Sequence, residues 1–251
     1  MTSDDGRLAH DLAAAAGRLL LELRSAGGDP SALRKAGDRQ SHEFLAAELA
    51  RHRPGDAVLS EEGLDDPARL SASRVWIVDP LDGTREFGEP GRTDWAVHVA
   101  LWQLGELTAG AVALPAQGTV LSTAEPRGDR PVPAPGPMRF VVSRTRPPAF
   151  VEQLAQQMGA VLLPMGSAGA KAAAVICGDA DAYIHSGGQY EWDSAAPVAV
   201  AAAAGLHTSR IDGSKLAYNQ AHPSLPDILI CEASLAGPLL EAISSAGAIS
   251  G

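Results

Sequence analysis

The chain carries two carboxylates three residues apart at the end of an apolar segment. Asp79 and Asp82 lie in the sequence DPLDGT at 79–84, directly after VWIV at 75–78. Branched and aromatic residues are enriched in β-strands, so both acids are expected at a strand end. Magnesium prefers oxygen ligands and is usually held by few carboxylates together with water and phosphate. The pattern therefore indicates a candidate magnesium site.

The residues between and after the two acids suit a site for metal and phosphate. Pro80 fixes φ and can bend the chain so that both carboxylates and the Leu81 carbonyl face one point. Gly83 and Thr84 can begin a helix whose N–H groups point at an anion. The same residue types also occur in ordinary turns and helix caps, and the segment alone leaves both interpretations open.

A second acidic pair favours the metal interpretation. Residues 60–62 (SEE) also lie at the end of a short strand candidate at 58–60. Ala36-Gly37-Asp38-Arg39 precede them, and residues 191–196 (EWDSAA) lie far downstream. In this order the four motifs resemble the inositol monophosphatase superfamily of lithium-sensitive, magnesium-dependent phosphatases, and the resemblance covers nearly the whole chain.

The residues after DGT indicate which branch of the superfamily the chain resembles. Arg85, Glu86 and Phe87 are similar to the basic residue, Glu and Phe of CysQ-type phosphatases acting on 3'-phosphoadenosine 5'-phosphate, whereas inositol enzymes usually show DGTTNF. Ser186 stands where inositol enzymes place a glutamate that binds a ring hydroxyl. Both departures argue against a pocket specific for a polyol.

The resemblance implies a role for each matching position. Metal ligands would be four carboxylates and one main-chain carbonyl, namely Glu61, Asp79, Asp82, Asp193 and, through its carbonyl oxygen, Leu81. Asp193 also suits the N-terminal cap of the helix that it begins, and the two roles are compatible.

Catalysis is assigned by the same resemblance to Asp38, Thr84 and Glu61. Asp38 would accept a hydrogen bond from Thr84, and the pair would orient and help to deprotonate a water. Phosphate esters hydrolyse extremely slowly unaided, and two cations can activate the water and neutralise the leaving oxygen. From the residues alone, Asp38 would also suit the cap of a following helix.

Substrate contacts are expected from two segments. Gly83 and Thr84 would hold the scissile phosphate, and Arg85 would contact phosphate or form a surface ion pair. Ser167 and Lys171 belong to GSAGAK at 166–171, which lacks the ending of a P-loop. They would contact the nucleotide or a second phosphate, although Lys171 could also be a solvated helix residue.

Apolar periodicity and turn residues predict the elements that must position these groups. Helices are expected from residues 3–5 to 23, at 41–52, after 148, at 167–176 and at 193–204, where Gly205 would be the C-terminal cap. Strands are expected at 58–60, 75–78, 95–102, 109–124 with a turn at 115–118, 139–142, 161–163 and 182–184.

A segment rich in proline and glycine divides the chain. Residues 125–137 lack apolar periodicity and are the best candidate boundary. We predict an α+β part at 1–137 that carries most metal ligands, and an α/β part at 138–251 that carries Asp193 and substrate contacts. The resemblance implies the layered α/β/α/β/α sandwich of the inositol monophosphatase and fructose-1,6-bisphosphatase superfamily, with the active site between the parts.

Composition limits the partners. The chain has 251 residues and a formal net charge of -10, and it lacks the basic stripe needed to bind a nucleic-acid duplex. Cys177 and Cys231 lie in apolar segments and are expected to be packed thiols. The N-terminal residues are acidic and amphipathic, unlike a secretory signal, and no apolar run is long enough for a bilayer. We therefore expect a cytoplasmic protein.

The expected activity is that of a 3'(2'),5'-bisphosphate nucleotidase of sulfur metabolism (sulfate assimilation), which converts 3'-phosphoadenosine 5'-phosphate to AMP and phosphate. Two or three Mg²⁺ ions and inhibition by Li⁺ follow from the resemblance, and many relatives form homodimers. One alternative is an inositol monophosphatase or fructose-1,6-bisphosphatase of broader specificity. The other is an inactive regulator that binds magnesium or nucleotide, against which the presence of every expected ligand speaks.

Overall fold

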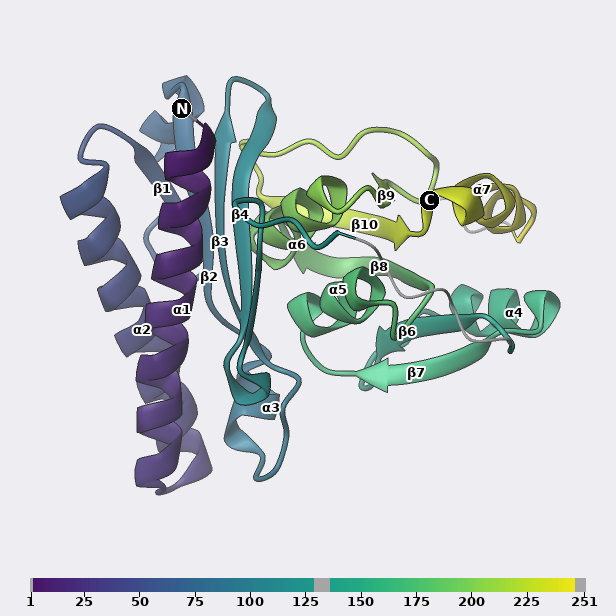
Figure 1. The fold of residues 1–251 in the computed structure, drawn as a ribbon, viewed down its shortest axis with the longest axis horizontal. Helices are drawn as coiled ribbons and strands as arrows, with labels where there is room; N and C mark the ends of the chain where they lie inside the picture. The colour runs from purple at the N-terminus through teal and green to yellow at the C-terminus, as the bar shows by residue number, and fades with distance from the viewer. Residues whose placement is uncertain (1, 129–135, 247–251) are drawn as a thin grey trace.

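Helices and sheets alternate in five layers (Figure 1). The computed structural model describes residues 2–128 and 136–246. The outer helix layers flank two sheets, and a third helix layer lies between the sheets. These layers contain α1 (Thr2–Ala26) and α2 (Pro30–His52) outside the first sheet, α5 (Ala168–Cys177) and α6 (Glu191–Ala203) in the middle, and α4 (Ala149–Met158) and α7 (Ala236–Ser245) outside the second. The predicted α/β/α/β/α sandwich is confirmed.

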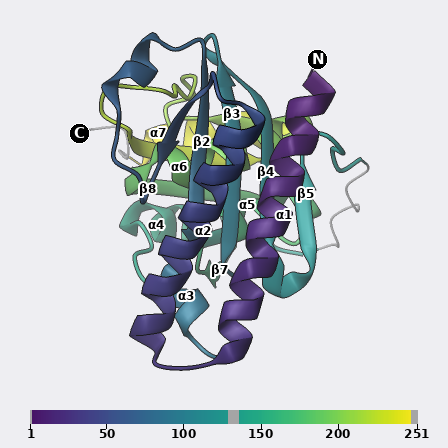
Figure 2. The ribbon, with the colours of Figure 1, turned by 90° about the vertical axis from the view of Figure 1, so that its left-hand side faces the viewer.

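The first sheet has the order β1-β2-β3-β4-β5. Its strands are β1 (Ala57–Ser60), β2 (Arg74–Asp82), β3 (Ala96–Gln103), β4 (Glu106–Leu114) and β5 (Thr119–Ser122). β1 pairs with β2 in parallel, and Ser60 is opposite Val78. Parallel strands end at the same edge of a sheet, so Glu61 and Asp79, each one residue further along, emerge side by side. Figure 2 shows α1 and α2 lying along the outer face of this sheet.

The second sheet has the order β7-β6-β8-β10-β9. Its strands are β6 (Arg139–Ser143), β7 (Val161–Met165), β8 (Ala182–Tyr190), β9 (His207–Ser209) and β10 (Ser224–Cys231). Short helical turns complete the fold at Pro67–Ser71, Thr84–Gly88 (α3), Pro115–Gln117 and Ala233–Leu235. β8 runs directly into α6, which places Asp193 one turn beyond the end of the strand.

Small side chains allow the middle helices to lie close to the first sheet. A Cβ added at Gly110 on β4 would come within 2.7 Å of the Ala199 Cβ on α6. The alanine-rich face of α6 is buried in a core that also includes residues of β1–β4 and α5. This packing fixes the first turn of α6 against the first sheet, where the acids of β2 end.

Most predicted elements are present, but α2 begins at Pro30 and not at residue 41. Asp29 caps it by accepting hydrogen bonds from the N–H groups of Ser31 and Ala32, and Pro30 occupies the first turn. The predicted start was wrong because residues 30–40 are mostly polar and show little apolar periodicity. Asp38 therefore lies inside a helix, which rules out the cap role for it.

The division of the chain at residue 137 stays a prediction. Residues 129–135 of the proposed boundary lie outside the described part of the chain. The expected helix end at Gly205 is found, since Gly205 has φ +78° directly after α6. Cys231 is buried and Cys177 is half-buried, as expected for packed thiols. None of the helices in the described ranges combines the length and apolar character that a bilayer crossing requires.

Candidate active site

Three aspartates from two elements converge between the sheets. Asp79 and Asp82 end β2, and Asp193 lies in the first turn of α6. One carboxylate oxygen of each lies within 4.8 Å of those of the other two. Glu61, which follows β1, lies near enough for its charge to act on Asp79 and for Asp193 and Asp82 to act on it. The structure thus brings three of the four predicted ligand carboxylates into one cluster and places the fourth beside it.

The electrostatics of this cluster favour a bound cation. Burial, together with the charges of Glu61, Asp82 and Asp193, raises the pKa of Asp79 well above its usual range. Burial and Asp82 raise the pKa of Asp193 to about 6. Desolvation of its carboxyl group and Asp193 raise the pKa of Glu61 to about 7, although the residue remains open to solvent on one side. An oxygen-only donor set whose charges repel one another fits a hard divalent cation such as Mg²⁺.

The end of β2 is shaped by local hydrogen bonds. The Leu81 N–H donates to Asp79 Oδ1 at 3.0 Å, and Ser41 Oγ on α2 donates to the Pro80 carbonyl at 2.7 Å. Pairing with β3 shifts register between Asp79 and Asp82, so the strand bulges between the two acids. Gly83 then takes a left-handed conformation (φ +84°) that turns the chain into α3.

Asp38 and Thr84 are in contact, as the resemblance implied. Thr84 Oγ1 lies 3.1 Å from Asp38 Oδ1 and also 3.1 Å from the Leu81 carbonyl oxygen, so its single proton can go to either acceptor. Burial raises the pKa of Asp38 to about 6, against the opposing effect of the Thr84 hydrogen bond. Gly37 makes this approach feasible, because a Cβ there would come within 2.8 Å of Phe87 and 2.9 Å of Leu81. The catalytic role of the pair stays a prediction.

Asp82 has two further partners that the sequence did not reveal. His98 on β3 is fully buried, with Nε2 3.2 Å from Asp82 Oδ2 and Nδ1 3.0 Å from the Trp192 carbonyl oxygen. The Gly169 N–H donates to Asp82 Oδ2 at 2.7 Å. Burial alone would raise the pKa of Asp82, but His98 and Lys171 bring it below its usual value. A polar residue inside the apolar run AVHVALW, at residues 96–102, was the available signal for His98.

Asp193 caps its helix and also lies in the acidic cluster, while its role as a metal ligand stays a prediction. Its Oδ2 accepts a hydrogen bond from the Tyr190 N–H at 2.6 Å, which caps α6. Its carboxylate also belongs to the acidic cluster. The neighbouring Glu191 is buried and accepts hydrogen bonds from the N–H groups of Asn219 and Gln220, at 2.6 and 2.8 Å. Glu191 therefore fixes the start of the helix that carries Asp193.

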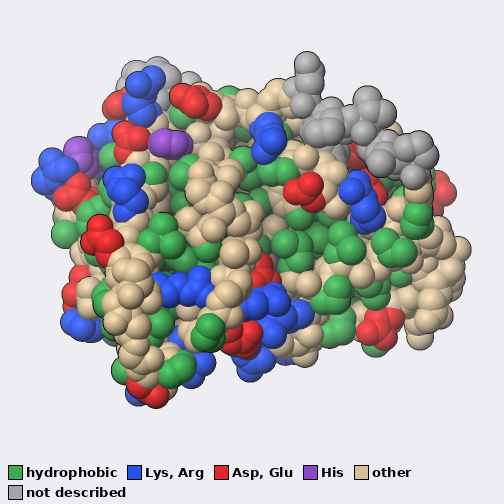
Figure 3. Space-filling model, turned by 60° about the horizontal axis from the view of Figure 1, so that its bottom comes forward, with side chains coloured by type: hydrophobic (Ala, Val, Ile, Leu, Met, Phe, Trp, Pro, Cys, Tyr) green, Lys and Arg blue, Asp and Glu red, His purple; other side chains and the backbone are tan. Residues whose placement is uncertain are grey.

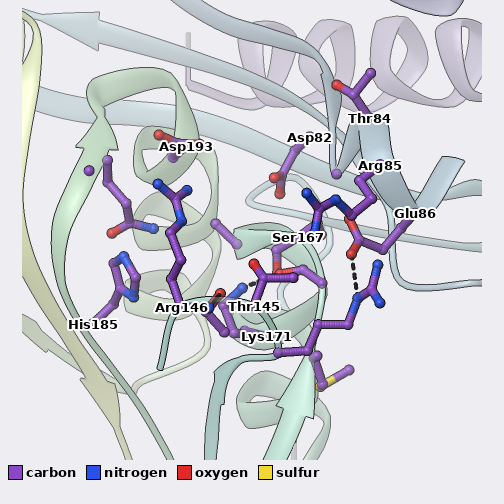
Figure 4. Close-up of a pocket in the computed structure, with 18 of the residues that line it drawn as sticks. Asp82, Thr84, Arg85, Glu86, Thr145, Arg146, Ser167, Lys171, His185 and Asp193 are labelled. Carbon is purple, nitrogen blue, oxygen red and sulfur yellow. Dashed lines mark hydrogen bonds and ion pairs between the residues drawn. The ribbon is translucent and has the colours of Figure 1, made fainter. Parts of the chain in front are cut away.

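A cavity of about 570 Å³ opens from the acids toward the second sheet (Figure 4). Asp82, Gly83, Thr84 and Arg85 line one end of it. The remaining polar lining includes Arg144, Arg146, Ser167, Lys171, His185 and Gln189. In a space-filling view of this side, Lys and Arg side chains gather near the middle of an otherwise acidic protein (Figure 3). The cavity thus joins an anionic end to a basic wall.

The predicted substrate residues all line this cavity. Ser167 is buried, and its Oγ accepts a hydrogen bond from the Ala170 N–H at 2.8 Å. Lys171 is only 4% exposed, so it is not a solvated helix residue. Its Nζ donates to the Gly166 carbonyl and, at 2.8 Å, to the Ser167 carbonyl, and burial lowers its pKa to about 8. Arg85 is exposed and has no ion-pair partner within residues 2–128 and 136–246, which leaves the surface ion pair without support.

The chain is similar to curated phosphatases along most of its length. It is 55% identical over 240 residues to the 3'-phosphoadenosine 5'-phosphate phosphatase of Mycobacterium tuberculosis, covering 92% of this chain and 90% of that protein. It is 33% identical over 195 residues to the 3'(2'),5'-bisphosphate nucleotidase CysQ of Escherichia coli, covering 73% and 78%.

Solved structures agree with the fold. CysQ from Bacteroides thetaiotaomicron, described as a bacterial member of the inositol monophosphatase family, superposes with a TM-score of 0.78 at 27% identity, covering 92% of this chain and 97% of that one. The family profile described as "Inositol monophosphatase family" matches residues 7–245. These matches confirm the resemblance inferred from the four motifs, and the chain belongs to the inositol monophosphatase family.

Proposed function

We propose that this chain is a Mg²⁺-dependent phosphatase that hydrolyses the 3'-phosphate of 3'-phosphoadenosine 5'-phosphate to AMP and inorganic phosphate. The observation that carries the proposal is the convergence of Asp79, Asp82 and Asp193 within 4.8 Å beside a basic cavity of about 570 Å³. That cavity volume is in the range of small-molecule sites. Relatives 53–55% identical to this chain bear the name of this activity, which supports the substrate assignment.

The acidic cluster would hold the metal. Glu61, Asp79, Asp82, Asp193 and the Leu81 carbonyl are the proposed ligands. When bound, Mg²⁺ would lower the pKa of the attacking water and offset the charge on the leaving oxygen. The carboxylates lie between the two sheets on rigid elements, so their positions are set before substrate arrives.

The proposed proton transfer runs through Thr84 and Asp38. Thr84 Oγ1 would accept the proton of the attacking water while it donates its own to Asp38 Oδ1, 3.1 Å away. Asp38 must be ionised to accept it, and a pKa of about 6 keeps it ionised at neutral pH while leaving it basic enough to serve. Glu61, which reaches the same cluster, would help to orient the water.

The remaining cavity residues would hold the substrate. The Gly83 and Thr84 N–H groups at the sharp turn after β2 would bind the scissile phosphate. Ser167 and Lys171 would form the floor of the nucleotide pocket. The family resemblance further suggests inhibition by Li⁺, a role in sulfate assimilation and a homodimer. The sequence suggests a cytoplasmic location.

Phosphate release from three substrates tests the proposal. The purified protein is assayed with 3'-phosphoadenosine 5'-phosphate, inositol 1-phosphate and fructose 1,6-bisphosphate, each with Mg²⁺ and with excess chelator. We expect the highest kcat/KM on the nucleotide and no release with chelator. A preference for inositol 1-phosphate would overturn the substrate assignment, and no release from any of the three would indicate an inactive regulator.

An Asp82→Asn variant tests the assigned site. It removes one ligand charge, so turnover should be lost while the protein stays folded. Asp11→Asn, on the exposed face of α1, is the matched control and should retain full activity. Near-normal activity of Asp82→Asn would show that the metal site is assigned wrongly.

A further inference from the structure

The basic residues of the cavity differ in whether their charge is already neutralised. Arg144 forms ion pairs with Glu86 and Glu89, both at 2.7 Å. Lys171 has two of its protons on main-chain carbonyls and lies over the Tyr183 ring, 5.3 Å from its centroid. Arg85 and Arg146, by contrast, are exposed and have no carboxylate within ion-pair distance in the part of the chain that the structure describes. Arg85 adjoins the turn proposed for the scissile phosphate, which leaves Arg146 for a second anion. An uncompensated guanidinium in a ligand cavity is a candidate for binding an anion.

The backbone holds Arg146 at the cavity. It follows β6, and its N–H donates to Ser143 Oγ at 3.2 Å. Two prolines come next, at 147 and 148, and the residue before a proline is restricted to extended conformations. A Cβ added at Gly188 would lie 3.4 Å from Arg146 Nη1, so this glycine leaves room beside the guanidinium. Figure 4 shows the Arg146 side chain extending into the cavity on the side of His185 and Asp193, opposite Arg85.

His185 does not compete for the same role. Its Nε2 lies 2.9 Å from the Gly187 carbonyl oxygen, which can only accept, so Nε2 carries the proton. Burial, followed by the charges of Lys171 and Arg146, lowers the pKa of His185 to about 4. At neutral pH the ring is therefore uncharged, and Arg146 is the cation on this wall of the cavity.

We propose that Arg146 binds the second, non-scissile phosphate of the substrate and so selects a bisphosphorylated nucleotide over a monophosphate. This inference rests on the proposed function. The scissile phosphate would lie at the Gly83–Thr84 turn at the end of β2. Arg146 lies across the cavity from that turn, on the side of His185, so the phosphate that it binds is the one that is not transferred. Arginine presents a planar fork that matches two phosphate oxygens, which gives geometric as well as charge selection.

Comparing the wild type and an Arg146 variant on two substrates tests whether Arg146 binds the second phosphate. The substrates are 3'-phosphoadenosine 5'-phosphate and 3'-AMP, which differ only in the 5'-phosphate. Arg146→Ala should lower kcat/KM on the bisphosphate by about 10- to 100-fold, the usual effect of losing charge-assisted hydrogen bonds. It should change kcat/KM on 3'-AMP by less than about threefold, since that substrate offers the arginine no phosphate. Arg146→Lys should recover part of the loss, because it restores the charge but not the fork.

Controls separate this inference from the proposed function. Arg51→Ala removes an exposed arginine of α2 outside the cavity and should leave both substrates unaffected. An equal loss on both substrates, or no loss on the bisphosphate, overturns the role of Arg146 while the phosphatase assignment stands. A selective loss in Arg85→Ala but not in Arg146→Ala would move the second-phosphate site to Arg85 and also overturn it. If the wild-type protein hydrolyses neither nucleotide, the proposed function itself fails.

Discussion

His98 and Asp82 form a buried pair in which His98 Nε2 lies 3.2 Å from Asp82 Oδ2. The other ring nitrogen lies 3.0 Å from the Trp192 carbonyl oxygen in the first turn of α6. One imidazole thus connects the acid at the end of β2 to the helix that carries Asp193. Burial alone would lower the pKa of His98, but the charge of Asp82 raises it overall. The pair fixes the orientation of a proposed metal ligand.

Replacing His98 should weaken metal binding more than it alters the fold. Residues that orient a metal ligand typically change metal affinity by about 10- to 100-fold when they are removed. We expect His98→Ala to raise the Mg²⁺ concentration for half-maximal activity by that factor. His98→Gln should have a smaller effect, because its amide nitrogen can reach the position of the histidine Nε2 and donate to Asp82. Initial rates measured over a Mg²⁺ titration at fixed substrate provide the comparison.

The histidine control lies on the opposite side of the first sheet. His10 on α1 is half-buried, and its hydrogen bond is to the neighbouring Asp11. His10→Ala should therefore leave the Mg²⁺ dependence unchanged. If His98→Ala also left it unchanged, the histidine would be a packing residue only.

Thr84 and Asp38 should act as one unit in catalysis. Thr84→Val removes the hydroxyl without a large change in volume, and Asp38→Asn removes the proton acceptor. Each should lower kcat by about 10²- to 10⁴-fold, the range for general base catalysis. Because the two groups serve one proton transfer, the double variant should be no slower than the slower single variant. If the double variant instead lost kcat by the product of the two single losses, the proposed proton transfer from Thr84 to Asp38 would be wrong.

The acidic cluster could be predicted from the sequence because each of its parts is a short local motif. DPLDGT, the residues SEE at 60–62 and EWD at 191–193 each carry their acids next to a strand or helix end, where chain direction alone brings them to the edge of a layer. Asp38 was found only through its motif. No local pattern indicated that it lies inside α2, where Gly37 allows contact with Leu81 and Phe87.

His98 and Arg146 escaped sequence analysis for a different reason. His98 lies in an apolar strand, and its partners Asp82 and Trp192 are 16 and 94 residues away. Arg146 is one of several arginines around the cavity. The sequence does not show that Arg144 is neutralised by ion pairs whereas Arg146 is not. Both roles depend on which charges the fold has already paired, and that information is absent from a linear pattern.

Gly37 should tolerate no side chain. An alanine Cβ would come within 2.8 Å of Phe87 and 2.9 Å of Leu81, two buried residues that have no room to move. Overpacking of this kind costs about 1–3 kcal/mol, so Gly37→Ala should lower the free energy of unfolding by that amount. It should also lower kcat, since α2 would be pushed away and Asp38 with it. Chemical denaturation and steady-state rates measure the two effects.

Gly55→Ala is the matched control, because nothing lies within 4 Å of a Cβ at Gly55. Its effect on the free energy of unfolding should stay within about 0.5 kcal/mol, as for most surface substitutions. A Gly37→Ala variant as stable and active as Gly55→Ala would show that the contact of α2 with α3 is looser than the structure indicates.

In the metal-free protein, the contribution of Asp79, Asp193 and Glu61 to stability should fall as pH rises from about 4 to 7. In the folded chain the pKa of Asp193 is raised from 3.8 to about 6, and that of Glu61 from 4.5 to about 7. The pKa of Asp79 is raised as well, by burial and by the neighbouring acids. A carboxyl group whose pKa is higher in the folded state stabilises the fold when it is protonated, and this contribution is lost as pH rises through the folded pKa. Bound Mg²⁺ opposes this loss, so its stabilising effect should be larger at pH 8 than at pH 5.

An Asp79→Asn variant separates two effects of the buried Asp79 charge, namely its destabilisation of the metal-free fold and its proposed role in binding Mg²⁺. The asparagine oxygen can still accept the Leu81 N–H, which in the wild type lies 3.0 Å from Asp79 Oδ1, while the repulsion within the cluster falls. In chelator at pH 8 the variant should therefore be more stable than wild type by about 0.5–2 kcal/mol, as is common where function requires a strained site. At pH 5, where the wild-type acids are largely protonated, the gain should shrink. Thermal unfolding with and without Mg²⁺ at both pH values measures these changes in stability. The variant should also lose activity and the increase in unfolding temperature that Mg²⁺ causes in the wild type. A variant that is destabilised in chelator at pH 8 would mean that the acids hold the fold together without a metal, contrary to the repulsion inferred from their positions.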